Sequence, residues 1–401
     1  MKRIERKEYF EKLVALRDKQ IIKIVTGVRR CGKSTLLEMF RDYLIDSGVR
    51  EENVIFVNLE DYDFKALRNP DALHEYIKTR LVKDEMTYVF IDEIQRCEQF
   101  PEVIDSLYLK PNVDIYLTGS NATLLSGEIA TLLTGRYIEV SMLPLSFKEY
   151  VTAAGEENLA QKYREYLETG SFPYALNLLG QPKELRDYLE GLYNTIVVKD
   201  IASRKKISDT MMLESVVRFV FDNIGSPLST KKIADTLTSE GRKIDVKTVE
   251  KYLNSLLESF IAYRANRYNI MGKQHLKTLE KYYVVDIGMR HMLLGSSSTN
   301  IGYILENVVY LELIRRGYEV YVGKIGELEV DFVAVDKTKT TYFQVAATVR
   351  DENTLRRVLA SLEKIKDHYP KFILTLDDDP EADYNGIRRA NALEWLIGKV
   401  V

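Results

Sequence analysis

The chain has 401 residues, which is too many for one ordinary hydrophobic core and predicts two or three domains. Hydrophobic residues make up 45% of it and charged residues 29%, as in soluble globular proteins, and a net charge of −3 argues against a chain-wide attraction to nucleic acid or membrane. Two cysteines and the absence of any apolar run near about 18 residues argue against a disulfide framework and a membrane span, so a cytoplasmic location is expected.

The segment from residue 20 to residue 37 carries the strongest chemical signal. An amphipathic helix is predicted ahead of it, and the apolar run at 21–25 predicts a short buried strand. Residues 27–34, GVRRCGKS, fit the spacing G-x-x-x-x-G-K-[ST] of a phosphate-binding loop, or P-loop. A helical stripe through Leu36 and Leu44 follows. Strand, loop and helix in this order are the context that a P-loop requires, whereas the alternative is an ordinary glycine turn before a helix.

The residue types of this loop suit nucleotide phosphates and a magnesium ion. Gly27 and Gly32 permit backbone conformations in which N–H groups face phosphate oxygens. Lys33 is expected to reach the β- and γ-phosphates, the Ser34 hydroxyl to hold Mg²⁺, and Thr35 to lie near the α-phosphate of ATP. The predicted cofactor-binding residues are Gly27, Arg29, Arg30, Gly32, Lys33, Ser34 and Thr35.

Strands and helices alternate through the next hundred residues. Strands are predicted at 53–59, 88–93 and 113–121, with helices over 71–83 and from Phe100 onward between them. This alternation predicts an α/β domain with a mostly parallel sheet and helices on both faces. Ligands bind such sheets at the carboxyl ends of the strands.

The strand at 88–93 ends in two carboxylates, Asp92 and Glu93. A strand-end Asp beside a P-loop holds Mg²⁺, so Asp92 is predicted to share the metal with Ser34. Glu93 is predicted to orient and deprotonate the attacking water. The alternative is a solvated acidic turn after a buried strand.

Two further side chains are candidates for the same site. Asn121 ends the next strand and, with Ser120, is placed to sense the γ-phosphate; it can equally cap a helix that begins at Ala122. Arg136 precedes a strand at 137–141 and is predicted to neutralise the transferred phosphoryl group, either in its own chain or across a subunit contact. The alternative for Arg136 is a surface salt bridge.

Five segments of the chain carry a family resemblance: GVRRCGKST, FIDEIQ, LTGSNATLLS, LTGR and LPLSFKEY. In this order they resemble a group of prokaryotic AAA-type P-loop ATPases that carry a C-terminal domain of unknown function similar to a restriction endonuclease. The resemblance implies a sheet whose sensor strand (113–121) lies between the P-loop strand and the acidic strand. It also makes a homo-oligomer an expectation, since AAA-type sites often use an Arg from a neighbouring subunit.

The pattern in the middle of the chain predicts several helices followed by a winged helix-turn-helix. Residues 156–200 are helical in pattern, with an interruption at 170–173, and suit a lid beside the nucleotide site. From Thr210, three helices and a hairpin predict the winged helix. Its recognition helix is predicted at Val246–Ser259, with Lys247, Thr248, Lys251 and Asn254 facing outward. Residues 203–281 hold 15 Lys/Arg and 9 Asp/Glu, a local balance of +6, which indicates either double-stranded DNA or, alternatively, a protein as partner.

The last hundred residues resemble the PD-(D/E)XK nucleases. In that fold, a helix Glu, a strand Asp and an E-x-K on the next strand collect Mg²⁺ and activate water. Glu306 and Asp331 match the first two positions, but Gln344 and Ala346 replace the Glu and the Lys. A catalytically silent binding module is therefore expected rather than a nuclease.

Four domains follow from these patterns: a P-loop AAA-type ATPase domain at 1–150, a helical lid or linker at 151–208, a winged helix at 209–295 and a restriction-endonuclease-like α/β domain at 296–401. The first functional hypothesis is an ATPase that uses ATP and Mg²⁺ and couples its nucleotide state to the later domains. The alternative is an ATP-dependent switch with negligible turnover that binds a protein or DNA; an ATP-dependent nuclease is the least favoured. No membrane partner is expected.

Overall fold

The computed structural model describes residues 3–122, 133–155, 158–295, 301–337 and 339–400. The chain divides into two compact units, Met1–Pro144 with Glu258–Phe260, and Leu145–Leu257 with Ile261–Val401. Within the described ranges, no helix combines the length and the apolar character that crossing a membrane would require. Each unit has its own sheet.

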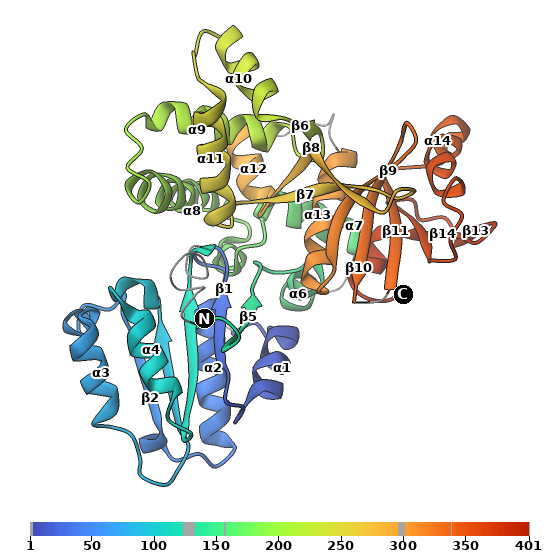
Figure 1. Cartoon of the computed structure of the whole chain (residues 1–401). Helices are drawn as coiled ribbons and strands as arrows, with labels where there is room; N and C mark the ends of the chain where they lie inside the picture. The colour runs from blue at the N-terminus through green and yellow to red at the C-terminus, as the bar shows by residue number, and fades with distance from the viewer. Residues whose placement is uncertain (1–2, 123–132, 156–157, 296–300, 338, 401) are drawn as a thin grey trace. The chain divides into compact units, whose positions relative to one another are not determined.

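The first unit is built on a five-stranded sheet in the order β2-β3-β4-β1-β5, and every pairing in it is parallel (Figure 1). The strands are β1 (Ile22–Thr26), β2 (Val54–Asn58), β3 (Thr87–Asp92), β4 (Val113–Gly119) and β5 (Tyr137–Ser141). The sensor strand β4 therefore lies between the P-loop strand β1 and the acidic strand β3, as the family resemblance implied.

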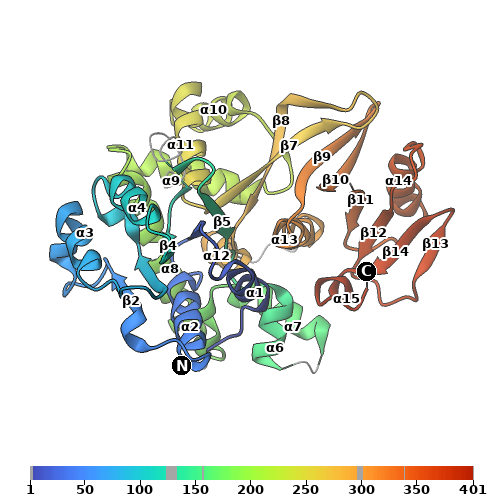
Figure 2. The ribbon, with the colours of Figure 1, turned by 60° about the horizontal axis from the view of Figure 1, so that its bottom comes forward.

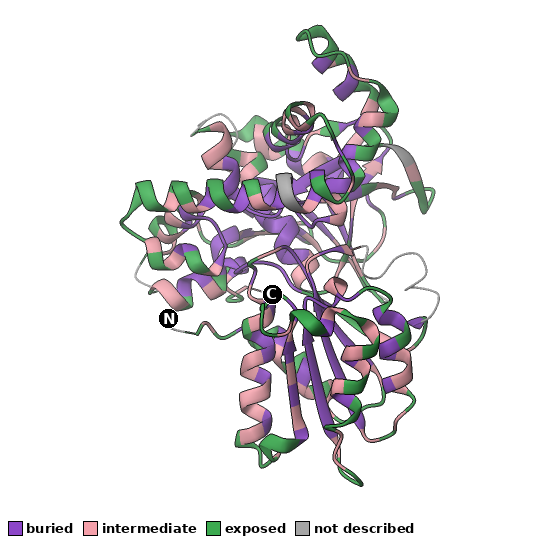
Figure 3. Cartoon of the chain, turned by 90° about the vertical axis from the view of Figure 1, so that its left-hand side faces the viewer, coloured by how far each residue is buried: buried purple, intermediate pink, exposed green. Residues whose placement is uncertain are grey.

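Helices cover both faces of this sheet. They are α1 (Lys7–Leu16), α2 (Lys33–Asp46), α3 (Pro70–Lys78) and α4 (Phe100–Tyr108), with short turns η1 (Glu51–Asn53), η2 (Lys65–Arg68) and η3 (Ile94–Arg96). Apolar side chains of α3 and α4, among them Ile77 and Ile104, share one core with Val57 of the sheet. On the other face, Phe40 of α2 contacts the Phe90 ring of β3. In Figure 3 the central strands are buried between helices that expose their outer sides.

The second unit begins with helices and continues as a mixed helix–strand assembly. Its helices are α6 (Phe147–Ala154), α7 (Leu159–Thr169), η5 (Pro173–Leu178), α8 (Pro182–Asn194), η6 (Thr195–Ser203), α9 (Thr210–Asp222), α10 (Thr230–Ser239), α11 (Val246–Glu258), α12 (Ile287–Leu294), α13 (Ile301–Arg315), α14 (Glu352–Glu363) and α15 (Ala392–Leu396). The helical run expected before residue 200 is present, and its predicted interruption falls between α7 and η5.

A close backbone approach explains that interruption. Gly170 ends α7 with φ +82°, in the left-handed region that favours glycine. A Cβ on Gly288 of α12 would lie 2.5 Å from the Gly170 Cα, and a Cβ on Gly170 would lie 2.7 Å from the Asp286 carboxylate, so neither position has room for a side chain. The buried Asp286 carboxylate caps α12 at the Met289 N–H and accepts a hydrogen bond from the Ser171 hydroxyl at 2.6 Å. The turn is thereby fixed to the start of α12.

All described strands of the second unit belong to one nine-stranded sheet, in the order β13-β14-β12-β11-β10-β9-β7-β8-β6. Figure 2 shows most of these strands side by side. Its strands are β6 (Pro227–Leu228), β7 (Ala262–Asn269), β8 (Gln274–Val284), β9 (Glu319–Ile325), β10 (Leu328–Asp336), β11 (Lys339–Ala346), β12 (Lys371–Thr375), β13 (Ala382–Tyr384) and β14 (Ile387–Asn391). The hairpin β7–β8 joins β9 because β7 pairs with it in parallel, with Tyr268 opposite Gly323. The boundary predicted at 295/296 therefore separates strands of one continuous sheet.

Candidate active site

The P-loop follows β1 at the carboxyl edge of the first sheet. Gly27, with φ +147°, has no space for a side chain, since a Cβ would lie 2.1 Å from the Met142 carbonyl oxygen. Gly32, with φ +107°, precedes the first residue of α2. The two glycines therefore allow the chain to turn tightly from strand to helix, and the backbone N–H groups at the start of α2 form an anion-binding helix terminus.

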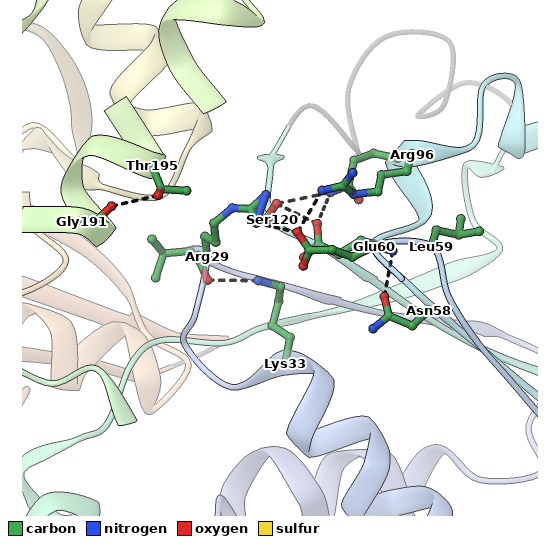
Figure 4. A network of polar contacts seen from close by, with 12 residues as sticks. Arg29, Lys33, Asn58, Leu59, Glu60, Arg96, Ser120, Gly191 and Thr195 are labelled. Atoms are coloured by element: carbon green, nitrogen blue, oxygen red, sulfur yellow. Dashed lines mark hydrogen bonds and ion pairs between the residues drawn. The ribbon is translucent and has the colours of Figure 1, made fainter. Parts of the chain in front are cut away.

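The Lys33 side chain folds back over this loop. It is only 4% exposed, and its Nζ donates to the carbonyl oxygens of Gly27 and Val28, each at 3.0 Å. Figure 4 shows the Lys33 side chain near Arg29 of the same loop. Carbonyl acceptors bind an ammonium less strongly than a phosphate does, because they carry no net charge. Lys33 is thus held beside the phosphate-binding loop by contacts that a phosphate can replace.

The two predicted magnesium ligands lie side by side. Asp92 ends β3, and its buried carboxylate accepts a hydrogen bond from Thr118 of β4 and interacts with the Ser34 side chain at the start of α2. Burial raises the pKa of Asp92, and these two neighbouring hydroxyl groups offset part of the effect. A carboxylate and a hydroxyl at one point form a hard oxygen donor pair of the kind that Mg²⁺ prefers.

Thr118 is a site residue that the sequence pattern did not single out. Its hydroxyl donates to Asp92 and accepts from the Glu93 N–H at 2.9 Å, and it is fully buried. One side chain of β4 therefore binds the Asp92 carboxylate and also the backbone of Glu93, the residue that follows β3. A polar residue at the end of an otherwise apolar strand was the available signal.

Glu93 is held in a defined orientation immediately after Asp92. Its backbone is left-handed, with φ +54°, and the side chain is buried. The carboxylate oxygen Oε2 accepts from the Ser120 hydroxyl at 3.0 Å and also from the Gln95 amide. Gln95 donates in addition to the Ser120 hydroxyl at 3.3 Å. The predicted base is therefore joined to the end of the sensor strand.

Asn121 follows Ser120 directly and is 5% exposed at this same edge of the sheet. Its place beyond β4 suits the predicted contact with a γ-phosphate. The alternative role as a helix cap concerns the segment after Ala122, and residues 123–132 lie outside the described part of the chain.

Arg136 lies at the amino-terminal ends of the strands, on the side of the sheet opposite to the P-loop. Its carbonyl oxygen accepts a hydrogen bond from the Ile22 N–H at 2.8 Å. Ile22 is the first residue of β1 and lies opposite Tyr137, the first residue of β5. The P-loop follows the other end of β1, about 16 Å away at roughly 3.3 Å per residue. The guanidinium donates to Asp105 and stands 5.5 Å from the Tyr108 ring centre. The predicted action of Arg136 on the site of its own chain is therefore wrong; action across a subunit contact stays a prediction.

Comparisons with known proteins agree with this geometry. A family model described as an AAA domain matches residues 19–151, and one described as a domain of unknown function matches residues 160–300. The chain is 39% identical over 399 residues to an uncharacterised protein of Haemophilus influenzae, with 98% of each chain covered. The chain belongs to the family of this protein. Its first unit is an AAA domain with a P-loop.

Two more distant proteins extend the comparison for this AAA protein. An uncharacterised protein of Methanocaldococcus jannaschii is 30% identical over 365 residues, which are 86% of this chain and 79% of the relative. The solved structure of a Walker-type ATPase of Pyrococcus abyssi has a TM-score of 0.52 at 15% identity, and the match covers 73% of this chain and 96% of that one. At this identity the match shows a shared fold.

The predicted arginines and Thr35 of the P-loop occupy different environments in the AAA domain. Arg29 Nη1 lies 2.9 Å from Oε1 of Glu60, which follows β2. Arg30 has a left-handed backbone, with φ +67°, and is exposed, as is Thr35 in the first turn of α2. Arg29 thus lies within the polar network of Figure 4, whereas Arg30 and Thr35 face solvent.

The outward face predicted for α11 is present except at one position. Lys247, Lys251 and Asn254 are exposed. Thr248 is half-buried, and its hydroxyl donates to the Asp245 carboxylate at 2.6 Å. Asp245 also accepts from the Thr248 N–H, so this pair caps the helix start rather than facing a ligand.

The C-terminal acids surround a lysine that the sequence did not associate with them. Lys281 of β8 is 2% exposed, and its Nζ lies 2.9 Å from Glu306, 2.8 Å from Glu329 and 3.9 Å from Asp331. The Tyr283 hydroxyl donates to Glu306 at 2.6 Å. Burial lowers the pKa of Lys281, but the three carboxylates together raise it above its usual value. The ammonium is therefore the counter-ion of this cluster.

The residues that replace the nuclease Glu and Lys have structural contacts. The Gln344 amide donates to the Ser361 hydroxyl at 2.6 Å and to the Glu329 carbonyl oxygen at 3.0 Å. Its carbonyl oxygen accepts from the Asp331 N–H at 3.2 Å. Ala346 is 9% exposed at the end of β11. These contacts join β10, β11 and α14. The positive charge beside the carboxylates is supplied by Lys281.

Proposed function

We propose that this AAA protein binds ATP with Mg²⁺ at the carboxyl edge of its first sheet and hydrolyses it to ADP and phosphate. The single observation that carries the proposal is the position of the buried Asp92 carboxylate, which interacts with Lys33 and Ser34 of the P-loop and directly precedes Glu93, whose carboxylate is bound by Ser120. Among the described residues, no three His, Cys, Asp or Glu side chains are grouped as a metal site. A magnesium ion that takes its remaining ligands from water and phosphate needs no such group.

The roles of the residues follow from their positions. Glu93 accepts the proton of a water whose oxygen forms a bond to the γ-phosphorus as the bond to the β–γ bridging oxygen breaks. ADP leaves with the bridging oxygen, and inorganic phosphate takes the hydroxyl. Lys33 neutralises charge on the phosphates, while Ser34 and Asp92 would hold Mg²⁺, which supplies Lewis-acid stabilisation when bound. Asn121 contacts the γ-phosphate.

Hydrolysis by the wild-type protein and by Lys33→Ala tests this function. We expect phosphate release that requires Mg²⁺ in the wild type, and a loss of at least about a hundredfold in kcat/KM in the variant, since Lys33 is the buried cation of the loop. Lys339→Ala, an exposed lysine of the second unit, is the matched control and should hydrolyse ATP as the wild type does. Wild-type protein that binds ATP without turnover would instead favour the switch.

The second unit is proposed to be the binding module that the nucleotide state controls. The order α9, β6, α10, α11, β7 and β8, with β6 paired to β8, supports a winged helix. The helix and mixed sheet from α13 to α14 support the nuclease-like fold proposed for the C-terminal part. Because Lys281 already neutralises Glu306 and Asp331, nuclease chemistry is not part of the proposal.

Binding of duplex DNA to the face of α11 is a separate test. Lys247→Ala/Lys251→Ala is expected to weaken binding uniformly across sequences and to lower the slope of log affinity against log salt by about two, one for each lysine that no longer pairs with a phosphate. Fluorescence anisotropy with a labelled duplex at several salt concentrations measures both. Lys339→Ala should leave affinity and slope unchanged. No binding by wild type at low salt would exclude DNA and favour a protein partner for this face.

A further inference from the structure

A carboxylate outside the predicted site holds two arginines at the nucleotide edge of the first sheet. Arg29 Nη1 and Arg96 Nη2 each lie 2.9 Å from the same oxygen, Oε1 of Glu60 (Figure 4). Arg29 belongs to the P-loop, and Arg96 ends η3, the turn that follows Glu93. Cations from the two halves of the proposed ATP site therefore share one anion.

The loop that carries Glu60 is fixed to the site. The Leu59 N–H donates to the Asp92 carbonyl oxygen at 3.1 Å, and the Glu60 N–H donates to the Asn58 side chain at 2.8 Å. Arg68 Nε donates to the Leu59 carbonyl oxygen at 2.9 Å. These contacts hold the backbone of Glu60 beside the end of β3, so Glu60 stays near the site whether or not its carboxylate is paired with an arginine.

The ion pairs of Glu60 are partly solvated and therefore weak. The side chains of Arg29, Arg96 and Glu60 are 16%, 33% and 43% exposed. Water screens such pairs, so releasing an arginine from them costs little. A terminal phosphate carries more charge and more acceptor oxygens than a carboxylate, and guanidinium binds it through paired hydrogen bonds. A phosphate is therefore a stronger partner for a guanidinium than the carboxylate of Glu60 is.

We propose that Glu60 is the resting counter-ion of Arg29 and Arg96 and that the γ-phosphate of ATP draws these arginines away from it. ADP has no γ-phosphate and leaves them paired with Glu60. The inference rests on the proposed ATP site and adds the residues that distinguish ATP from ADP. It also supplies, within one chain, the positive charge at the transferred group that Arg136 cannot supply there.

Calorimetric affinities of the full chain for a non-hydrolysable ATP analogue and for ADP, both with Mg²⁺, test the proposal. Arg29→Ala and Arg96→Ala are each expected to weaken binding of the analogue about tenfold and to change ADP affinity by less than about twofold. Glu60→Gln should tighten the analogue by about two- to fivefold, because it removes the competing anion, and leave ADP unchanged. Arg50→Ala is the control. It breaks the exposed ion pair between Arg50, which precedes β2, and Glu85, which precedes β3, and should change neither affinity.

The outcomes separate this proposal from the ATP site on which it rests. Wild type that binds neither nucleotide would refute the site itself. Equal weakening of the analogue and ADP in the arginine variants would show that the arginines only shape the loop, and unchanged analogue affinity would also overturn the proposal. Arg29→Ala/Arg96→Ala is expected to lower kcat at saturating ATP about a thousandfold. Wild-type kcat in that double variant would overturn the charge-neutralising role.

Discussion

Glu93→Gln is expected to abolish ATP hydrolysis and to leave nucleotide binding intact. The amide keeps the size of the carboxylate and a carbonyl oxygen that Ser120 and Gln95 can bond, but it cannot accept a proton from water. We expect kcat to fall by about 10²–10⁴-fold, the usual contribution of a general base. Steady-state phosphate release, measured beside the affinity for ATP, checks both halves of the expectation.

Glu98→Gln is the matched control for this experiment. Glu98 is exposed and follows η3 by two residues, so the same change of charge occurs near the site without touching it. Its kcat should equal that of the wild type. Hydrolysis at the wild-type rate in Glu93→Gln would remove Glu93 as the base, and loss of ATP binding in the same variant would assign it a structural role after β3.

Lys281→Met is expected to destabilise the second unit by about 3–5 kcal/mol, the usual cost of removing one partner from a buried charge network. Methionine fills the stem of the lysine but leaves Glu306, Glu329 and Asp331 without their cation. The network joins β8 of the hairpin to α13 and β10, so the loss should appear as unfolding of the second unit at lower temperature. Thermal unfolding followed by circular dichroism measures the shift.

Two further variants test whether the loss of stability in Lys281→Met comes from the buried charge network. Lys339→Met is the same substitution at an exposed position of the same sheet and should change stability by no more than about 0.5 kcal/mol. Lys281→Met/Glu306→Gln removes one of the unpaired charges and should recover part of the loss, as coupled neighbours do. A double variant as unstable as the sum of its two single changes would contradict the network.

The pH dependence of Asp331 gives the cluster a second signature. Burial, and then the nearby Glu306 charge, raise the pKa of Asp331 to about 7. The native state therefore binds this proton more tightly than the unfolded chain does, and Asp331 lowers the free energy of unfolding as pH rises from about 4 to about 7. Asp331→Asn removes this dependence, so we expect its stability relative to wild type to increase over that range.

Short-range sequence patterns determined the nucleotide half of this protein. The P-loop spacing, with Gly27, Lys33 and Ser34, lies within a single strand–turn–helix unit, and the Asp92–Glu93 pair ends one buried strand. Such signals are readable because glycine conformations, strand length and helix start are properties of neighbouring residues. The strand order came from the family resemblance, since periodicity along the chain does not specify which strands become neighbours.

Only the tertiary structure decided which distant side chains meet. Spacing placed Arg136 near the site, but parallel pairing of β1 and β5 puts it at the opposite edge. In the sequence, Lys281 is one of many charged residues in a basic segment. In the structure it is the buried cation that Glu306, Glu329 and Asp331 surround. Glu60 acquires its two arginines because β2, β3 and the P-loop end at one edge of the sheet.

The same reason accounts for the domain boundary near residue 295. Amphipathic patterns show where strands form and which face is apolar, but the edge of a hairpin offers unpaired N–H and C=O groups to any strand that packs beside it. Here β7 takes β9 as its partner, and one sheet runs through what two local patterns predicted as separate domains. The P-loop and the Asp92–Glu93 pair depend on residues that are neighbours in sequence. The ion pairs and the continuous second sheet depend on residues that become neighbours only in the folded chain.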